Sequence, residues 1–336
     1  MTRRQMLQCL GTVAPQVMLG AAKNAPLIQT VSGTIHSSEL GVTLVHEHVT
    51  ADLRPVPERR LGDYDRDEAL QVSLPFIRQL RDAGCTAIVD PTPMNMGRDP
   101  LLLKRLSEDS GLVIVCATGV FGAAGGKFLP AYAHDESAEE IGTRYVREIR
   151  SGIGDTGVRP GIIKTGIDPD EPLSPLARKL VSAAAFAQRE TALTIASHTG
   201  PGRRAFEQLD VLEALGVPPS AFIWVHADNE KDHQMHIRAA RLGAWVEFDS
   251  LNRLDVLEWH LKCVVAMAEA GVLDRTLISH DAGWYQPGKP KGGTYRGYTP
   301  IFTDLVPRLR QSGFSSSDLD RLLIQNPSRA LTGGIT

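Results

Sequence analysis

The amino-acid sequence predicts an α/β protein folded as a single (β/α)8 TIM barrel. From residue 41 onward, eight short apolar runs alternate with amphipathic segments of helical period. Glycines follow several of the helical segments, at the position where helices commonly end. A doubly wound open sheet is the alternative, but it usually has fewer strands and a glycine-rich turn after the first strand, and no such turn follows the first run here. Eight strands therefore favour closure into a barrel.

The predicted elements follow one another in a regular order. A short β-hairpin over residues 27–36 is expected to precede the barrel, and one or two closing helices are expected over residues 315–331. The eight predicted strands span residues 43–48, 86–90, 112–117, 161–165, 193–198, 222–226, 244–249 and 276–281. The predicted helices span residues 67–83, 100–110, 136–151, 175–190, 203–215, 230–242 and 254–270. We expect residues 23–336 to form one domain.

Charge and composition exclude several classes of partner. The chain has 36 basic and 39 acidic residues, a formal net charge of -3, and no basic field that would recruit nucleic acid. Residues 1–22 have the order of a twin-arginine export signal, with Arg3 and Arg4 before a short apolar stretch and small residues. We expect export to the periplasm, with a cytoplasmic protein as the alternative. No other stretch reaches the roughly 18 apolar residues of a membrane span, so no membrane partner is expected.

The first predicted strand ends in a pair of histidines, His46 and His48, separated by Glu47. Side chains alternate along a strand, so the two imidazoles should point to one face and Glu47 to the other. Two imidazoles on one face can share a metal ion, although a pair of ordinary hydrogen-bonded histidines would give the same pattern. Four later strands end in a histidine or in another polar residue. These residues are Lys164, His198, His226 and Asp281.

The carboxyl ends of all strands in such a barrel meet at one mouth, where the chemistry takes place. Four histidines, a lysine and an aspartate would therefore face one another. Imidazole and carboxylate bind zinc, manganese, cobalt or iron. An ammonium group cannot bind a metal, but two dications should lower the pKa of Lys164, and the neutral amine can add carbon dioxide to form a carbamate that bridges both ions. A structural lysine or a Schiff-base lysine is the alternative for Lys164.

These motifs resemble those of the phosphotriesterase family of the amidohydrolase superfamily. The resemblance rests on H-E-H at residues 46–48, I-I-K-T-G at 162–166, S-H-T-G at 197–200, V-H-A-D at 225–228, S-H-D at 279–281 and N-P-S-R-A-L at 326–331. It covers roughly residues 30–332. It implies two divalent metal ions per chain, with zinc expected and manganese, cobalt or iron as alternatives, and it implies a homodimer.

The resemblance also implies a role for each ligand. His46, His48 and Asp281 would hold the more buried ion, His198 and His226 the more exposed one, and an N-carboxylated Lys164 would bridge both. A metal-bridging hydroxide would attack a small-molecule ester, lactone or phosphoester, with Asp281 taking the proton. Natural lactone substrates in the family favour a lactone or carboxylic ester over a phosphotriester (organophosphate). By the same resemblance, Phe121 would line the substrate pocket.

The loop predicted after the eighth strand, residues 282–299, combines glycines with aromatic residues that include Trp284. Such a loop beside the metals is typical of a mobile lid that contacts substrate, and a merely flexible connection is the alternative. Two other functions stay open at this point. One is a non-catalytic barrel that binds a small ligand around structural metals, and the other is a metal-free Schiff-base lyase that uses Lys164.

Two positions depart from the family pattern. Ser250 follows the aspartate that ends the seventh strand, where family members often carry His or Arg. Asp228 and Asn229 compete as the acid that supports the sixth-strand histidine. The remaining histidines are assigned structural places: His36, His134 and His260 on the surface, His233 and His236 on a solvated helix face with weak chelation as the alternative, and His280 turned away from the mouth.

Overall fold

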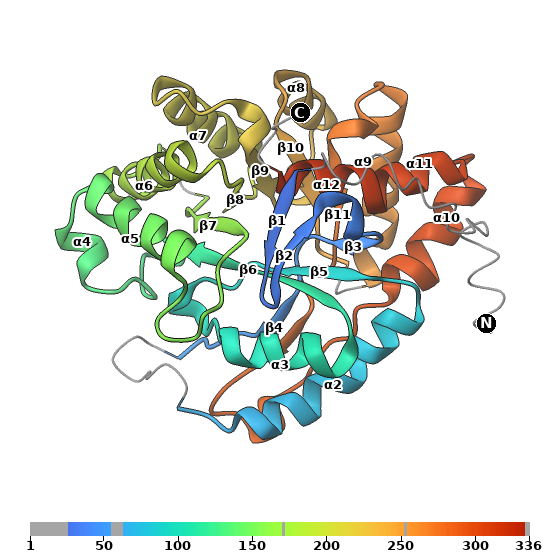
Figure 1. Cartoon of the computed structure of the whole chain (residues 1–336). Coiled ribbons are helices and arrows are strands. Elements are labelled where there is room, and N and C mark those ends of the chain that lie inside the picture. Colours follow the sequence, from blue (N-terminus) through green and yellow to red (C-terminus); the bar gives the residue numbers. More distant parts are fainter. Residues whose placement is uncertain (1–25, 55–62, 170–171, 252–253, 333–336) are drawn as a thin grey trace.

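The computed structural model of the chain describes residues 26–54, 63–169, 172–251 and 254–332 (Figure 1). The predicted export signal at residues 1–22 lies outside these described residues. None of the described helices is long and apolar enough to cross a membrane.

Eight parallel strands form the barrel, as the sequence predicts. Their order in the sheet is β11-β10-β9-β8-β7-β6-β5-β3, so each strand lies beside the next one along the chain. The strands are β3 (Thr43–Leu44), β5 (Ala87–Asp90), β6 (Val113–Gly119), β7 (Ile162–Gly166), β8 (Ile195–His198), β9 (Phe222–Val225), β10 (Trp245–Phe248) and β11 (Thr276–Ile278). Because neighbours run in the same direction, all their carboxyl ends lie on one side of the molecule.

The barrel closes at its carboxyl end through a second short sheet. In this sheet, β4 (His48–Thr50) pairs in parallel with β12 (Gly283–Tyr285). Just below it, the backbone N–H of Asp281 donates to the carbonyl of His46 at 3.0 Å. The prediction of one continuous strand over residues 43–48 is therefore wrong, and this segment is divided into β3 and β4. The division arises because the N–H of His46 donates to the Ser279 hydroxyl (2.9 Å) instead of to the backbone of a neighbouring strand.

The outer layer consists of helices that alternate with the strands. They are α2 (Arg66–Asp82), α3 (Pro100–Ser110), α4 (Tyr132–Asp135), α5 (Ala138–Ser151), α6 (Pro175–Thr191), α7 (Gly202–Ala214), α8 (His233–Leu242), α9 (Leu257–Glu269), α10 (Val306–Gln311), α11 (Ser316–Asp320) and α12 (Asn326–Leu331). Local signals start them: the Asp99 carboxylate accepts from two N–H groups of the first turn of α3, and Pro100 occupies its first position. The sequence did not predict α10 or the π-helix Ile301–Leu305 before it.

The amino-terminal end of the barrel is filled by both ends of the domain. The hairpin of β1 (Leu27–Thr30) and β2 (Gly33–His36) is present as predicted, and in Figure 1 it lies across the centre of the ring with α12 beside it. Ile28 of β1 and Leu331 of α12 belong to the same buried cluster as the inward-facing strand residues Val89 and Val115. This plug leaves the carboxyl end as the open end of the barrel.

Candidate metal centre

The ring nitrogens of His46 and His48 converge with the carboxylate of Asp281 on one point. The two Nε2 atoms are 3.1 Å apart. The Asp281 Oδ1 atom lies 3.2 Å from Nε2 of His48 and 3.8 Å from Nε2 of His46. Ligand atoms at about 2.0–2.2 Å from a common ion are separated by roughly 3–4 Å, so these three donors have the spacing of a metal site.

Hydrogen bonds at the opposite ring nitrogens hold both imidazoles in the tautomer that a metal requires. The Nδ1 atom of His46 lies 2.8 Å from Glu247 Oε1 and 3.0 Å from Asp249 Oδ2. The Nδ1 atom of His48 lies 2.6 Å from the Thr92 hydroxyl, which itself donates to the carbonyl of Thr50. Each Nδ1 therefore donates its proton, and each Nε2 keeps its lone pair for an ion.

His198 and His226 form the second half of the site. Their ring centroids are 4.5 Å apart, and the His226 ring lies 5.2 Å from that of His46. The Nδ1 atom of His226 lies 2.6 Å from Asp249 Oδ1. Burial lowers the pKa of His198 well below its usual value, so this imidazole is neutral, as a metal ligand must be.

Asp249 joins the two halves of the site. Its carboxylate accepts from the Nδ1 atoms of both His46 and His226 and from the backbone N–H of His226 at 3.1 Å. The residue is fully buried, so it orients the two rings from behind. Sequence reasoning missed this role, although Glu247 and Asp249 are two residues apart at the end of β10 and so share the inward face.

Lys164 lies between these groups on β7. Its side chain is buried, and the Nζ atom has no hydrogen-bond partner among the described residues. Burial lowers the pKa of Lys164 against the opposing influence of Glu247, Asp249 and Asp281. A buried amine without a partner is costly, and addition of carbon dioxide would convert it into a carbamate with oxygens for two ions. The donor set therefore fits a binuclear metal centre.

Two of the predicted ligands have a strained backbone conformation. His226 (φ 59°) and Asp281 (φ 52°) both adopt the left-handed conformation, which costs a non-glycine residue about 1–3 kcal/mol. Glu47 holds the second of them in place, because its buried carboxylate accepts from the ring of His280 (2.6 Å) and the N–H of Ala282 (3.1 Å) on either side of Asp281. Glu47 and His280 thus point away from the mouth, as the sequence predicts.

A cavity of about 90 Å³ opens over these groups and is lined by all six predicted metal ligands. Its other walls are mostly apolar, formed by Ala51, Thr92, Pro93, Met96, Phe121 and Trp284. Phe121 lies with its ring centroid 4.9 Å from that of His198. The indole N–H of Trp284 donates to Asp281 Oδ1 at 3.3 Å. The structure thus places both predicted substrate-binding aromatics in the wall of the cavity.

The loop after β11 is more regular than a simple flexible connection. It contains β12, and Tyr298 at its far end is fully buried with its hydroxyl donating to the carbonyl of His48 at 3.1 Å. The part that faces the cavity is Trp284, over whose ring the Arg296 guanidinium lies at 4.6 Å. The loop is therefore anchored at both ends beside the site.

Of the two candidates after His226, Asp228 is the one whose side chain is buried beside the site. Its buried carboxylate accepts from the Ser250 hydroxyl and from the backbone N–H of Asp249 at 3.2 Å, whereas Asn229 is exposed. His260, predicted on the surface, is fully buried instead, because α9 packs against this segment and the His260 Nε2 accepts from the N–H of Ser250 at 3.1 Å. Asp228 therefore supports the site through Asp249.

The barrel brings the six predicted ligands together at one mouth, an arrangement typical of metal-dependent hydrolases of the amidohydrolase type. The chain belongs to the phosphotriesterase family, whose model matches residues 26–331. This finding confirms the family and the fold that the sequence predicts.

Similar proteins cover nearly the whole chain. A phosphotriesterase homology protein of Escherichia coli is 31% identical over 298 residues, which are 86% of this chain and 97% of the relative. An aryldialkylphosphatase of Saccharolobus solfataricus is 27% identical over 307 residues, 88% of this chain and 96% of the relative. A human N-acetyltaurine hydrolase is 27% identical over 347 residues, with 91% and 97% covered.

A solved structure agrees with these relatives. It comes from the engineering of organophosphate hydrolysis from a weak promiscuous lactonase template, and it matches with a TM-score of 0.82 at 31% identity, covering 91% of this chain and 99% of that one. The names of these similar proteins include a phosphatase, a lactonase and an N-acetyltaurine hydrolase. Family membership therefore defines a class of hydrolases without selecting one substrate.

Proposed function

We propose that this protein is a two-metal hydrolase that cleaves an ester-type bond, with a lactone or a small carboxylic ester as its substrate. The observation that carries the proposal is the convergence of His46, His48 and Asp281 beside the amine of Lys164, which has no hydrogen-bond partner in the described parts of the chain. When bound, the two ions would supply an activated water for attack and polarise the oxygen of the bond to be cleaved.

Each half of the site would bind one of the two metal ions. His46, His48 and Asp281 would hold one ion, His198 and His226 the other, and a carboxylated Lys164 would contribute an oxygen to each. This set of imidazoles and carboxylates suits zinc, and it also suits manganese, cobalt or iron. Asp249 would orient the ring of His46 toward one ion and the ring of His226 toward the other.

Side chains of the protein would accept the proton of the attacking water and bind the substrate. The Asp281 carboxylate stands at the cavity wall, where it would take the proton of the attacking water. The indole N–H of Trp284 fixes the position of that carboxylate. Phe121 and Trp284 would contact the part of the substrate next to the reacting carbon.

The size and lining of the cavity support the choice of substrate. A volume of about 90 Å³ is small beside the roughly 300–1,000 Å³ of pockets for drug-sized ligands. It suits a lactone ring or a short acyl group with an apolar face. A dialkyl aryl phosphate is the second candidate, because the relative from Saccharolobus solfataricus is an aryldialkylphosphatase.

A substrate panel tests the proposal. The metal-stripped protein is reloaded with zinc, manganese or cobalt and assayed with a small lactone, an aryl acetate and a dialkyl aryl phosphate. We expect metal-dependent turnover with the highest kcat/KM on the lactone or the acetate. A higher kcat/KM on the phosphate would reverse the substrate assignment, and no metal-dependent turnover would favour a barrel that only binds a ligand.

The Lys164→Ala variant separates the hydrolase from a lyase. It should lose both metals and activity together, and short carboxylic acids should restore part of the activity by replacing the carbamate. The exposed Lys289 offers a matched control, and Lys289→Ala should retain metals and activity. Trapping of a metal-free protein by borohydride with a carbonyl substrate would contradict the hydrolase in favour of a Schiff-base mechanism.

A further inference from the structure

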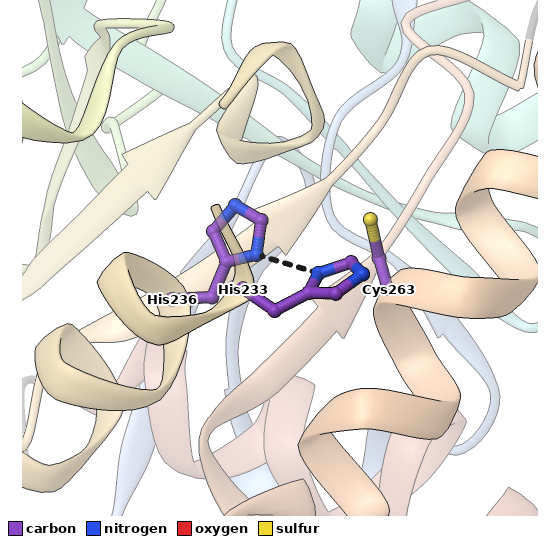
Figure 2. Close-up of side chains that lie close together, drawn as sticks. All are labelled: His233, His236 and Cys263. Atoms are coloured by element: carbon purple, nitrogen blue, oxygen red, sulfur yellow. Dashed lines mark hydrogen bonds between the residues drawn. The ribbon is translucent and has the colours of Figure 1, made fainter. Parts of the chain in front are cut away.

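A second cluster of metal-ligating side chains lies behind the candidate metal centre. It consists of His233 and His236 on α8 and Cys263 on the neighbouring helix α9, and one ligand atom of each lies within 4.8 Å of the others (Figure 2). None of these three residues lines the cavity of the candidate metal centre. The sequence predicted a solvated helix face here, but His236 is fully buried.

His236 presents an unprotonated ring nitrogen to the cluster. Its Nε2–H donates to the carbonyl of Ala227 at 2.8 Å, so the proton is on Nε2 and Nδ1 is unprotonated. Burial lowers the pKa of His236 to about 4, which keeps the ring neutral at neutral pH. The carbonyl that fixes this tautomer belongs to the residue next to His226.

The separation between the two histidines fits a shared ion. The Nδ1 atoms of His233 and His236 are 3.5 Å apart, which is long for a hydrogen bond. Two nitrogens bound at 2.0–2.1 Å to one tetrahedral ion are about 3.3 Å apart. A shift of a few tenths of an ångström would therefore bring both nitrogens to a metal.

The remaining groups complete the site. The His233 ring stacks on Trp259 at 4.8 Å, which limits its orientation, and it is only half-buried, which leaves a path for an ion from solvent. Cys263 is fully buried and forms no disulfide within the part of the chain that the structure describes. Burial raises the pKa of Cys263, so the thiol keeps its proton in the absence of a metal. A bound ion would displace that proton, and the thiolate would offset the charges of the ion and of nearby Lys231 and Lys262.

We propose that His233, His236 and Cys263 bind a third metal ion, distinct from the catalytic pair, with a water molecule as its fourth ligand. Two imidazoles and one thiolate select a borderline or soft ion of the zinc class rather than magnesium or calcium. The ion would fasten α8 to α9 and, through these helices, the segment Ala227–Asn229 that follows His226. Both helices already hold this segment, because the rings of His236 and Trp259 donate to the carbonyls of Ala227 and Asp228.

This arrangement gives the third ion a positioning role. His226 adopts a left-handed backbone conformation that its surroundings must maintain. The carbonyls of Ala227 and Asp228, which follow His226, accept hydrogen bonds from His236 and from Trp259. An ion that immobilises His233 and His236 therefore also immobilises the turn after His226. Loss of this ion should therefore weaken retention of the ion at His198 and His226.

Cobalt substitution tests the proposal on the full-length, metal-loaded protein. Cobalt bound to a thiolate gives a sulfur-to-metal charge-transfer band in the near ultraviolet, and the lining of the candidate metal centre contains no cysteine. The wild-type protein should bind three cobalt ions per chain and show the band. Cys263→Ser should lose the band and one ion, whereas Cys85→Ser, at another buried cysteine, should keep both.

Two further variants keep the test decisive if Cys263→Ser does not fold. His236→Gln can still donate to the carbonyl of Ala227, and His233→Phe can still stack on Trp259, but each removes a nitrogen ligand. Both should release the third ion and abolish the band. Absence of the band from the wild-type protein, or its persistence with three ions in all of these variants, would overturn the proposal.

Discussion

Asp249 offers the sharpest test of how the candidate metal centre is organised, because one carboxylate serves both halves. It accepts from Nδ1 of His46 at 3.0 Å and from Nδ1 of His226 at 2.6 Å. Asp249→Asn keeps the size of the side chain but replaces one acceptor oxygen with an amide donor. The ring that faces the amide must then carry its proton on Nε2, the atom that would bind the metal.

The expected cost follows from this change of tautomer. Loss of a hydrogen-bond partner behind a ligating histidine typically lowers metal affinity by about 10–100-fold, equivalent to about 1.4–2.7 kcal/mol. The change should fall on at least one ion and should lower kcat more than it raises KM, since Asp249 does not line the cavity. Glu247→Gln should have a smaller effect, because His46 is the one histidine of the site to which Glu247 is hydrogen-bonded, and Asp249 still supports that ring.

Competition with a chromophoric chelator measures both affinities in the variant and in the wild-type protein. Asp135→Asn, at an exposed position on α4, is the control for loss of a carboxylate elsewhere. Circular dichroism shows whether the variant is folded. A folded Asp249→Asn protein that binds both ions with wild-type affinity would refute the view that Asp249 orients the two rings.

Three other predictions concern separate parts of the molecule. Phe121→Ala should enlarge the cavity and raise kcat/KM for bulky aryl esters relative to small lactones in steady-state assays, and an unchanged ratio would remove Phe121 from the substrate wall. Arg98→Met should lower the free energy of unfolding by about 3 kcal/mol in urea titrations, since it leaves Glu148 without the buried guanidinium that binds it twice at 2.8 Å. In the metal-stripped protein, the folded-state pKa of His236 is about 4 against an ordinary 6.5, so its stabilisation is present above pH 6.5 and is lost as pH falls toward 4. His236→Gln should reduce the slope of the unfolding free energy in this window by up to about 1.4 kcal/mol per pH unit, and identical slopes would contradict the assigned burial.

The sequence predicted the barrel, and it predicted which side chains meet at its mouth, for a physical reason. Alternating short apolar runs and amphipathic segments determine a parallel sheet, and a parallel barrel brings all strand ends to one mouth. Lys164, His198, His226 and Asp281 could therefore be grouped without knowledge of any contact. The alternation of side chains along a strand also predicted that Glu47 points away from His46 and His48. This prediction holds although the strand is interrupted between Leu44 and His48.

Features that depend on non-local packing escaped the sequence. His236 and His260 lie on helices with mixed faces, and their burial depends on how α8 and α9 pack against the turn after His226. The π-helix Ile301–Leu305 begins where the N–H of Ile301 donates to the His280 ring, a contact between residues 21 positions apart. The role of Asp249 also escaped the sequence analysis, although the alternation of side chains along β10 was a signal that Glu247 and Asp249 face the mouth.

Anomalous diffraction from a crystal of the metal-loaded protein tests the central claim most directly. At the mouth of the barrel the account predicts two strong peaks about 3.5–4 Å apart, one between His46, His48 and Asp281 and the other beside His198 and His226. Density for a carboxylate on the Nζ atom of Lys164 should connect the two peaks. A mouth with no peak, or with a single ion beside an unmodified Lys164 amine, would contradict the two-metal hydrolase.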